Sequence, residues 1–305
     1  IKSKKHIYYN YNGLGSQMIN NDKSIFLLER IANALDRLAP PEKKIDNLHK
    51  SEGFVYDSKT GLIRPIEGIN RIPISLLQGI EPQKKLLLDN TLNFSQNLTA
   101  NNALLWGARG TGKSSLVKAV HAEILLKTKS THLKLVEIHR EDISELPELL
   151  YLLSQNKNFK FILLCDDLSF DAGENTYKSL KAALDGGIEG KPNNVIFYAT
   201  SNRRHLMPRD MMENERSTAI NPSESVEEKV SLSDRFGLWI GFHNMSQDTF
   251  LEIVYGYCDE FKISIDKNIL KSEALEWSIT RGARSGRVAW QFIQDLAGKN
   301  KIKIY

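Results

Sequence analysis

The sequence of 305 residues predicts an α/β protein, with a doubly wound parallel sheet followed by an all-α C-terminal lid. The first observation is that short, continuous apolar runs alternate with segments of helical periodicity. These runs are Leu133–Ile138, Phe161–Cys165, Val195–Ala199 and Trp239–Phe242. Such runs are typical of parallel strands covered on both faces. The second observation is that the strand pattern stops after His243, and three helical patterns follow at 246–261, 266–280 and 285–297. We therefore expect an α/β sheet domain at 76–243 and a helical lid at 244–305.

The N-terminal part of the chain has a different pattern. Residues 24–38 carry apolar side chains at helical spacing, and Pro40 and Pro41 end that pattern. Two short apolar runs, Phe54–Tyr56 and Leu62–Arg64, flank a polar turn and predict a hairpin. We assign residues 1–75 to a separate N-terminal region of unknown role.

Composition bounds the possible partners and the compartment. The 41 basic residues against 37 acidic ones give a net charge of +4, which does not by itself support nucleic acid as a partner. No apolar run approaches the roughly 20 residues of a membrane span, and no apolar segment follows Ile1–Lys5 to make a signal peptide. The two cysteines, Cys165 and Cys258, lie in apolar contexts and indicate no disulfide framework. We expect a cytoplasmic protein without membrane contact.

A glycine-rich stretch at 107–114 carries the strongest chemical signal. Its sequence, Gly-Ala-Arg-Gly-Thr-Gly-Lys-Ser, fits the phosphate-binding pattern G-x-x-x-x-G-K-[ST] at every defined position. It lies between a predicted strand at Ala103–Trp106 and a predicted helix at Ser115–Leu126. Its glycines let backbone N–H groups curl around phosphates, and the helix N-terminus adds partial positive charge. This predicts ATP as ligand, contacted by Gly107, Ala108, Arg109, Gly110, Thr111, Gly112, Lys113, Ser114 and Ser115.

Within that loop, two side chains have distinct expected roles. Lys113 is expected to reach the β- and γ-phosphates, and Ser114 to offer its hydroxyl to Mg²⁺.

The apolar run Phe161–Cys165 is followed by two carboxylates. Asp166 is expected to hold Mg²⁺, directly or through water, and Asp167 to orient or deprotonate the attacking water. The alternative is a strand with an ordinary polar end.

Two further residues follow or precede strands at positions that suit catalysis. Asn202 follows the run Val195–Ala199, where its side chain is expected to meet the γ-phosphate and the water; the alternative is an Asn that supports a turn. Arg235 precedes the last strand, and we consider it an arginine finger for the nucleotide of a neighbouring subunit, worth on the order of 10³–10⁵ in rate. Its alternative role is a surface salt bridge with Asp234.

Arginines cluster in two other places. Arg281–Arg287 opens the last predicted helix, where Arg284 or Arg287 is expected to reach back over the nucleotide, although both residues suit a solvated surface equally. Arg203, Arg204 and Arg209 form a basic cluster just beyond Asn202. Such a cluster suits a solvated face, a contact with phosphate or a neighbouring subunit, or a contact with nucleic acid.

Taken in order, these residues resemble the AAA-type ATPase superfamily. The resemblance implies that 107–114 is its Walker A motif, 161–167 its Walker B motif, Asn202 its sensor 1, Arg235 its arginine finger and Arg284 its sensor 2. The triplet Gly282-Ala-Arg284 at a helix start is similar to the sensor 2 motif of Clp-type unfoldases. Leu77–Gln83 resembles the segment that packs on the adenine, which implies contacts from Gly79 and Ile80; its alternative is a plain loop before a helix.

Over residues 54–300 the chain more narrowly resembles the bacterial AAA-type family catalogued as domain of unknown function 815. The resemblance is carried by Trp106–Val117, Cys165–Phe170, Ala199–His205 and Ser231–Leu238, and it implies binding and hydrolysis of ATP with Mg²⁺. Two departures from the superfamily pattern stand out. Asp167 replaces the usual Glu, and no aromatic–hydrophobic–Gly triplet follows Leu133–Ile138, which counts against a polypeptide-threading motor.

These observations together predict an ATPase that remodels an unidentified macromolecular client. The superfamily implies a homo-oligomer, a ring or open spiral and most commonly a hexamer, because the finger acts on the neighbouring subunit. Three alternatives remain open: a nucleotide-gated scaffold with little hydrolysis, a P-loop kinase and a nucleic-acid-associated ATPase.

Overall fold

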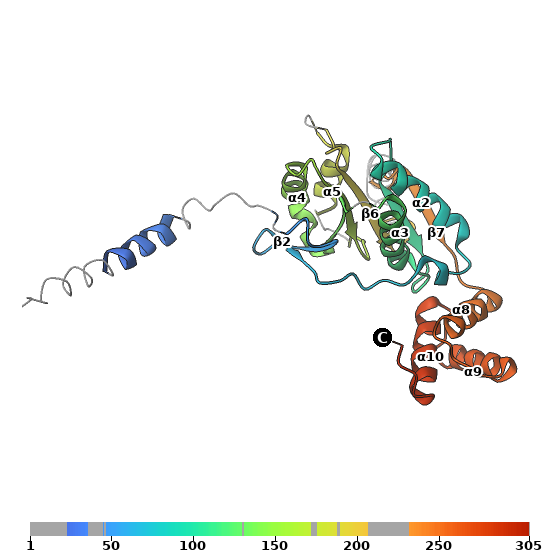
Figure 1. Cartoon of the computed structure of the whole chain (residues 1–305). Helices are drawn as coiled ribbons and strands as arrows, with labels where there is room; N and C mark the ends of the chain where they lie inside the picture. Colours follow the sequence, from blue (N-terminus) through green and yellow to red (C-terminus); the bar gives the residue numbers. More distant parts are fainter. Residues whose placement is uncertain are drawn as a thin grey trace, which may run out of the picture. The chain divides into compact units, whose positions relative to one another are not determined.

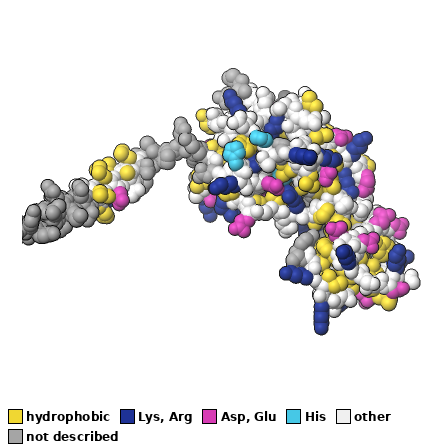
Figure 2. Space-filling model, in the orientation of Figure 1, with side chains coloured by type: hydrophobic (Ala, Val, Ile, Leu, Met, Phe, Trp, Pro, Cys, Tyr) yellow, Lys and Arg dark blue, Asp and Glu magenta, His cyan; other side chains and the backbone are white. Residues whose placement is uncertain are grey.

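The computed structural model describes residues 23–35, 45, 47–129, 131–171, 176–187, 190–206 and 232–304, which fall in two separate units. The first unit, Ile1–Lys44, contains a helix over residues 23–35. Its large apolar side chains, including Leu28 and Leu35, are more than half exposed and gather visibly on this helix in Figure 2. The helix expected at 24–38 is confirmed over its described part. The second unit, Ile45–Tyr305, holds the rest of the described chain.

Seven strands of the second unit form one sheet in the order β2-β1-β4-β5-β6-β3-β7 (Figure 1). The strands are β1 (Gly53–Asp57), β2 (Leu62–Pro65), β3 (Ala103–Gly107), β4 (Leu133–Ile138), β5 (Lys160–Cys165), β6 (Val195–Ser201) and β7 (Leu238–Phe242). Among these pairings, that of β1 with β2 is antiparallel and the others are parallel. Because β3 lies between β6 and β7, and β5 lies beside β6, the carboxyl ends of these strands meet at one edge of the sheet.

The β1–β2 hairpin belongs to this sheet, so the domain boundary expected at residue 76 is wrong. Gly53 of β1 pairs with Leu135 of β4 in parallel register. Phe54 and Tyr56 are buried in the core, and the buried Lys134 ammonium donates to the Ser51 carbonyl oxygen at 2.7 Å. The pattern of a short hairpin indicates its own turn, but it does not show which distant strand the hairpin joins.

Helices cover both faces of the sheet, which confirms the doubly wound architecture. On one face, η2 (Arg140–Glu145), α4 (Leu146–Ser154) and α5 (Thr176–Asp185) bury side chains such as Leu149 and Leu180. On the other face, α2 (Glu81–Ser95) and α3 (Lys113–Thr128) bury side chains such as Leu87 and Leu116. Leu104 of β3 packs into the first core and Leu105 into the second, because successive strand residues point to opposite faces.

The expected helical lid is present as three helices, α8 (Gln247–Glu260), α9 (Lys267–Thr280) and α10 (Gly286–Lys299), grouped beside the sheet domain in Figure 1. Each helix begins after a capping residue whose side chain accepts a hydrogen bond from a backbone N–H of the first turn; these capping residues are Ser246, Asp266 and Ser285 respectively. The lid has its own apolar core, which Leu76 of η1 (Ile74–Leu76) joins. The segment just before α2 therefore packs against the lid.

Two observations concern ligands and membranes. Within the described part of the chain, no helix combines the length and the apolar character that crossing a bilayer requires. The same residues contain no group of three or more His, Cys, Asp or Glu side chains placed to hold a metal. Cys165 and Cys258 are buried free thiols, and burial raises the pKa of Cys258 to about 11.

Candidate functional site

The glycine-rich loop joins the end of β3 to the first turn of α3, as the sequence predicts. Gly110 and Gly112 have φ angles of +73° and +91°, which side chains rarely tolerate. At Gly107 a Cβ atom would lie 1.9 Å from the Phe242 carbonyl oxygen of β7, so only glycine fits there. The loop therefore needs glycine at all three positions, for backbone conformation or for close approach.

Lys113 lies inside this loop. Its Nζ donates to the carbonyl oxygens of Gly107 at 2.9 Å and Ala108 at 2.7 Å, and to Asn202 Oδ1 at 3.1 Å. Burial lowers the pKa of Lys113, an effect that the carboxylates of Asp166 and Asp167 partly oppose. The ammonium group thus links the P-loop to the polar ends of the neighbouring strands.

Three oxygen-bearing side chains meet beside the loop. The hydroxyls of Ser114 and Thr200 both donate to Asp166 Oδ1. Hydroxyl and carboxylate oxygens are the ligands that Mg²⁺ prefers, so this donor set fits the metal expected at Ser114 and Asp166. Thr200 was not predicted from the sequence, although it precedes Asn202 by two residues in the polar end of the same strand.

Asp167 and Asn202 also come together. Asn202 Nδ2 donates to Asp167 Oδ1, and the Asp167 backbone N–H donates to Thr200 Oγ1 at 3.0 Å. Asp167 adopts a φ of +54°, a left-handed conformation that Asp tolerates better than most residues. The expected carboxylate and its expected amide partner are thus in direct contact at the edge of the sheet.

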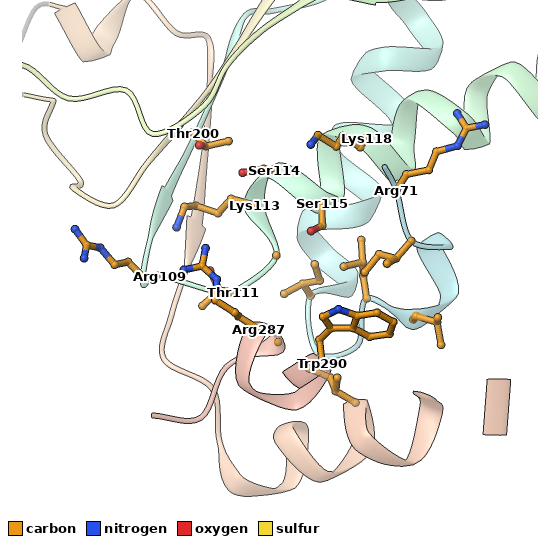
Figure 3. Close-up of a pocket in the computed structure, with 18 of the residues that line it drawn as sticks. Arg71, Arg109, Thr111, Lys113, Ser114, Ser115, Lys118, Thr200, Arg287 and Trp290 are labelled. Carbon is orange, nitrogen blue, oxygen red and sulfur yellow. The ribbon is translucent and has the colours of Figure 1, made fainter. Parts of the chain in front are cut away.

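These residues line a pocket of about 820 Å³ between the sheet domain and the lid, a volume typical of small-molecule sites (Figure 3). One part of the lining is polar and carries the loop residues from Arg109 to Ser115. The other part is largely apolar, with Ile72, Leu76, Leu77, Ile80, Ile253, Tyr257 and Trp290. A cationic, N–H-rich end beside an apolar end suits a ligand that joins phosphates to an aromatic base.

The lid contributes Arg287 to this pocket, whereas the resemblance had pointed to Arg284. Helix α10 is capped by Ser285, so Arg287 lies in its first turn, next to Thr111 in Figure 3. Arg284 precedes the cap and lines a second hollow, which also borders Ala108 and Arg109. Trp290 was missed entirely, although its three-residue spacing from Arg287 places both on one face of α10.

Of the two residues expected at the adenine, Ile80 lines the pocket and Gly79 does not. Gly79 has a φ of +74°, and a Cβ there would come within 2.2 Å of Thr249 Cγ2 in α8. Gly79 therefore allows the segment before α2 to pack closely against the lid.

Arg235 lies apart from the pocket-lining residues of its own chain. Its Nε donates to Asp185 Oδ1 at 2.7 Å, so its described carboxylate partner is Asp185 at the end of α5, not Asp234. In the basic cluster, Arg203 donates to the Phe170 carbonyl oxygen at 3.4 Å, and Arg204 lies over the Trp106 ring at 5.2 Å. Arg209 lies outside the described residues.

The structure resembles that of RuvB from Thermotoga maritima, described as a Holliday junction branch migration motor. This match has 14% sequence identity, covers 73% of this chain and 71% of that chain, and has a TM-score of 0.42. It also resembles Orc1 from Aeropyrum pernix, solved in complex with DNA, with 15% identity, coverage of 75% of this chain and 63% of that chain, and a TM-score of 0.52. At such identities the likeness shows the fold alone. No curated protein matches the sequence.

A family model described as protein of unknown function (DUF815) matches residues 49–300, which is most of the chain. The parallel sheet, the P-loop between β3 and α3 and the C-terminal helices are the fold of AAA-type P-loop ATPases. Because the family model covers most of the chain, the chain belongs to the DUF815 family, and its fold is that of AAA-type P-loop ATPases.

Proposed function

We propose that this protein is a Mg²⁺-dependent ATPase that cleaves the β–γ bond of ATP by in-line attack of water. The observation that carries the proposal is the convergence of Lys113, Asp166, Asp167 and Asn202 at the carboxyl ends of adjacent parallel strands. In open α/β sheets, ligands bind at this edge. A P-loop, a metal-binding carboxylate and a second, water-facing carboxylate are the parts that nucleotide hydrolysis requires.

In the proposed complex, the phosphates lie on the N–H groups of the loop at the N-terminus of α3. Lys113 exchanges its bonds to the Gly107 and Ala108 carbonyl oxygens for bonds to phosphate, and Arg287 reaches the same end from the lid. The base occupies the apolar end beside Trp290. Ser114 and Asp166, with Thr200 behind them, would hold Mg²⁺, which supplies charge neutralisation on the phosphate oxygens when bound.

Asp167 and Asn202 are the residues proposed to place the water. The amide of Asn202 already holds the Asp167 carboxylate, which leaves the second carboxylate oxygen of Asp167 to accept from a water. As the water oxygen attacks the γ-phosphorus, the bond to the β-phosphate oxygen breaks and the water proton passes to Asp167. ADP leaves with the bridging oxygen, and inorganic phosphate is released.

We further propose that the protein acts as a homo-oligomer, a ring or spiral and most simply a hexamer, in which Arg235 meets the nucleotide of a neighbouring copy. The support is its position in this chain: Arg235 does not line the chain's own pocket, so it would need another copy to reach a nucleotide. The client is an unidentified macromolecule, and a cytoplasmic location stays a prediction.

A nucleotide-gated scaffold is the second candidate, because Asp167 is shorter than the usual Glu and is already bonded to Asn202. Nucleic-acid binding gains no comparable support, since Arg203 and Arg204 both make contacts within the chain. Phosphate release by the wild type and Asp167→Asn separates ATPase from scaffold.

If the protein is an ATPase, the wild type should release phosphate steadily. Asp167→Asn should release phosphate about 10²–10⁴-fold more slowly and should keep its affinity for ATP. Asp295→Asn, which removes a carboxylate paired with Lys299 in α10, is the matched control and should keep the wild-type rate. If neither the wild type nor Asp167→Asn releases phosphate while both still bind ATP, the scaffold function is established instead.

A further inference from the structure

Asp185 occupies a position where a carboxylate is locally unfavourable. It is the last residue of α5, and the C-terminus of a helix carries partial negative charge, so a cation is the stabilising choice there. The residue before it, Leu184, is buried in the core, and a Cβ on the residue after it, Gly186, would lie 2.6 Å from the backbone of Gly190 and Lys191. A carboxylate that opposes the local helix preference calls for a reason beyond the stability of the helix.

The carboxylate of Asp185 is bound to the proposed finger. Arg235 Nε donates to Asp185 Oδ1 at 2.7 Å, and the side chains of Arg235 and Asp185 are 21% and 47% exposed. The backbone around Arg235 is fixed independently, because Leu232 and Phe236 are buried and Trp239 Nε1 donates to the Ser233 carbonyl oxygen at 2.7 Å.

The Asp185 carboxylate is the group of α5 that the structure shows in contact with the Arg235 guanidinium. The partial negative charge at the end of a helix attracts a cation but does not fix its orientation. A carboxylate bonded to Nε adds a fixed direction, because the donors of the planar guanidinium are arranged in a rigid fork. A long side chain that is already oriented also loses less rotamer entropy when it meets its target.

We propose that Asp185 is a positioning residue, which orients Arg235 for contact with the nucleotide bound by a neighbouring copy. This inference rests on the proposed trans role of Arg235. It differs from that role because it assigns the geometry of the finger to a second residue of the same chain. A small misplacement of a positioned group can cost about 10²-fold in rate, so the effect should be measurable.

The first test is Asp185→Ala. We expect kcat for phosphate release to fall by about tenfold or more, with KM for ATP within about twofold of the wild type, because the subunit's own pocket is intact. The melting temperature should stay the same or rise, since the helix C-terminus loses an unfavourable charge. Asp185→Glu, which restores the charge, should recover part of kcat. Asp295→Ala, in the α10 pair with Lys299, is the matched carboxylate control.

The second test asks whether the effect passes through Arg235. The double variant Asp185→Ala/Arg235→Ala should be no slower than Arg235→Ala alone. Mixing Asp185→Ala with Lys113→Ala should recover hydrolysis, because the Lys113→Ala copy supplies an aligned finger and the other copy supplies an intact pocket.

Three results would overturn the inference. One is a wild-type kcat in Asp185→Ala, and another is a loss of melting temperature that accounts for the loss of rate. The third is a wild-type rate in Arg235→Ala, which removes the finger itself. If the wild type hydrolyses nothing, the proposed function fails separately. In that case, light scattering measures how strongly ATP makes copies of the protein associate. Asp185→Ala must weaken this association as Arg235→Ala does, or the inference is wrong.

Discussion

Arg284 and Arg287 lie three residues apart, yet they line different hollows, and single substitutions should separate their roles. Arg287→Ala should weaken ATP binding by about tenfold or more, because a hydrogen bond to a charged group is worth about 1.5–3 kcal/mol. Arg284→Ala should change the affinity by less than about twofold. Calorimetric titration with Mg²⁺ and ATP measures both, and a larger loss in Arg284→Ala would contradict the described geometry.

The residues with the clearest chemistry were predictable from sequence, and those that depend on helix register were not. Asp166, Asp167 and Asn202 directly follow strands, Lys113 follows the glycine-rich loop after β3, and the ends of adjacent parallel strands necessarily meet. The residue pattern alone leaves Arg284 and Arg287 open and the family resemblance points to Arg284, because neither reveals that α10 starts after Ser285. No local pattern indicates that the α5 carboxylate pairs with an arginine 50 residues away.

At the scale of elements, α3 and β4 are joined by a buried histidine that should make stability depend on pH. His121 is fully buried, and its Nε2 lies 3.2 Å from the Leu133 carbonyl oxygen. Burial lowers the pKa of His121 to about 4 from its usual 6.5. The folded protein therefore keeps His121 neutral at a pH where the unfolded chain takes up a proton.

The sign follows from this difference. Above pH 6.5 both states are neutral at His121 and there is no effect. As pH falls from 6.5 to 4, only the unfolded state gains a proton, and the free energy of unfolding should drop by about 3 kcal/mol. Urea unfolding at several pH values measures the drop. This drop should shrink in His121→Leu and persist in His243→Gln, which changes an exposed histidine. If the free energy of unfolding of His121→Leu falls with pH as steeply as that of the wild type, the assignment is refuted.

Element positions were easier to predict than their pairing. The interior strands are predictable because each is a continuous apolar run of strand length, and the three lid helices because apolar side chains recur in them at helical spacing. The pairing of β1 with β4 was missed because it joins residues far apart in the chain, such as Gly53 and Leu135. A short sequence pattern does not show which distant residues pair, so the predicted domain boundary at residue 76 lies too far along the chain.

At the scale of the whole molecule, the division into two units predicts that the first is dispensable for folding. All three apolar cores of the sheet and lid are built from residues at or after Ile45. A protein lacking residues 1–44 should therefore unfold cooperatively, with a melting temperature within a few degrees of the full chain. Thermal unfolding followed by circular dichroism measures this, and loss of the cooperative transition would show that the N-terminal unit supports the fold.

The proposed oligomer leads to a mixing experiment. Arg235→Ala should leave ATP affinity nearly intact while hydrolysis falls by orders of magnitude, on the order of 10³–10⁵ for a finger. Lys113→Ala should lack hydrolysis because it lacks the ammonium group that we propose binds phosphate. A mixture of the two should recover activity in an oligomer that combines both. If the mixture shows no hydrolysis and the protein is monomeric at micromolar concentration in the presence of ATP, the trans arrangement is refuted.

Every proposed role depends on one event, the binding of ATP by Lys113 and the loop around it in the pocket between the sheet and the lid. Calorimetric titration of Mg²⁺ and ATP into the wild type and Lys113→Ala examines this event, with Lys127→Ala, which removes an exposed lysine of the same helix outside the pocket lining, as a control of equal charge change. We expect one ATP per chain for the wild type and the control, and at least about a hundredfold weaker binding for Lys113→Ala. Absence of binding by the folded wild type, or equal affinity in Lys113→Ala, would show that the pocket is not the ATP site.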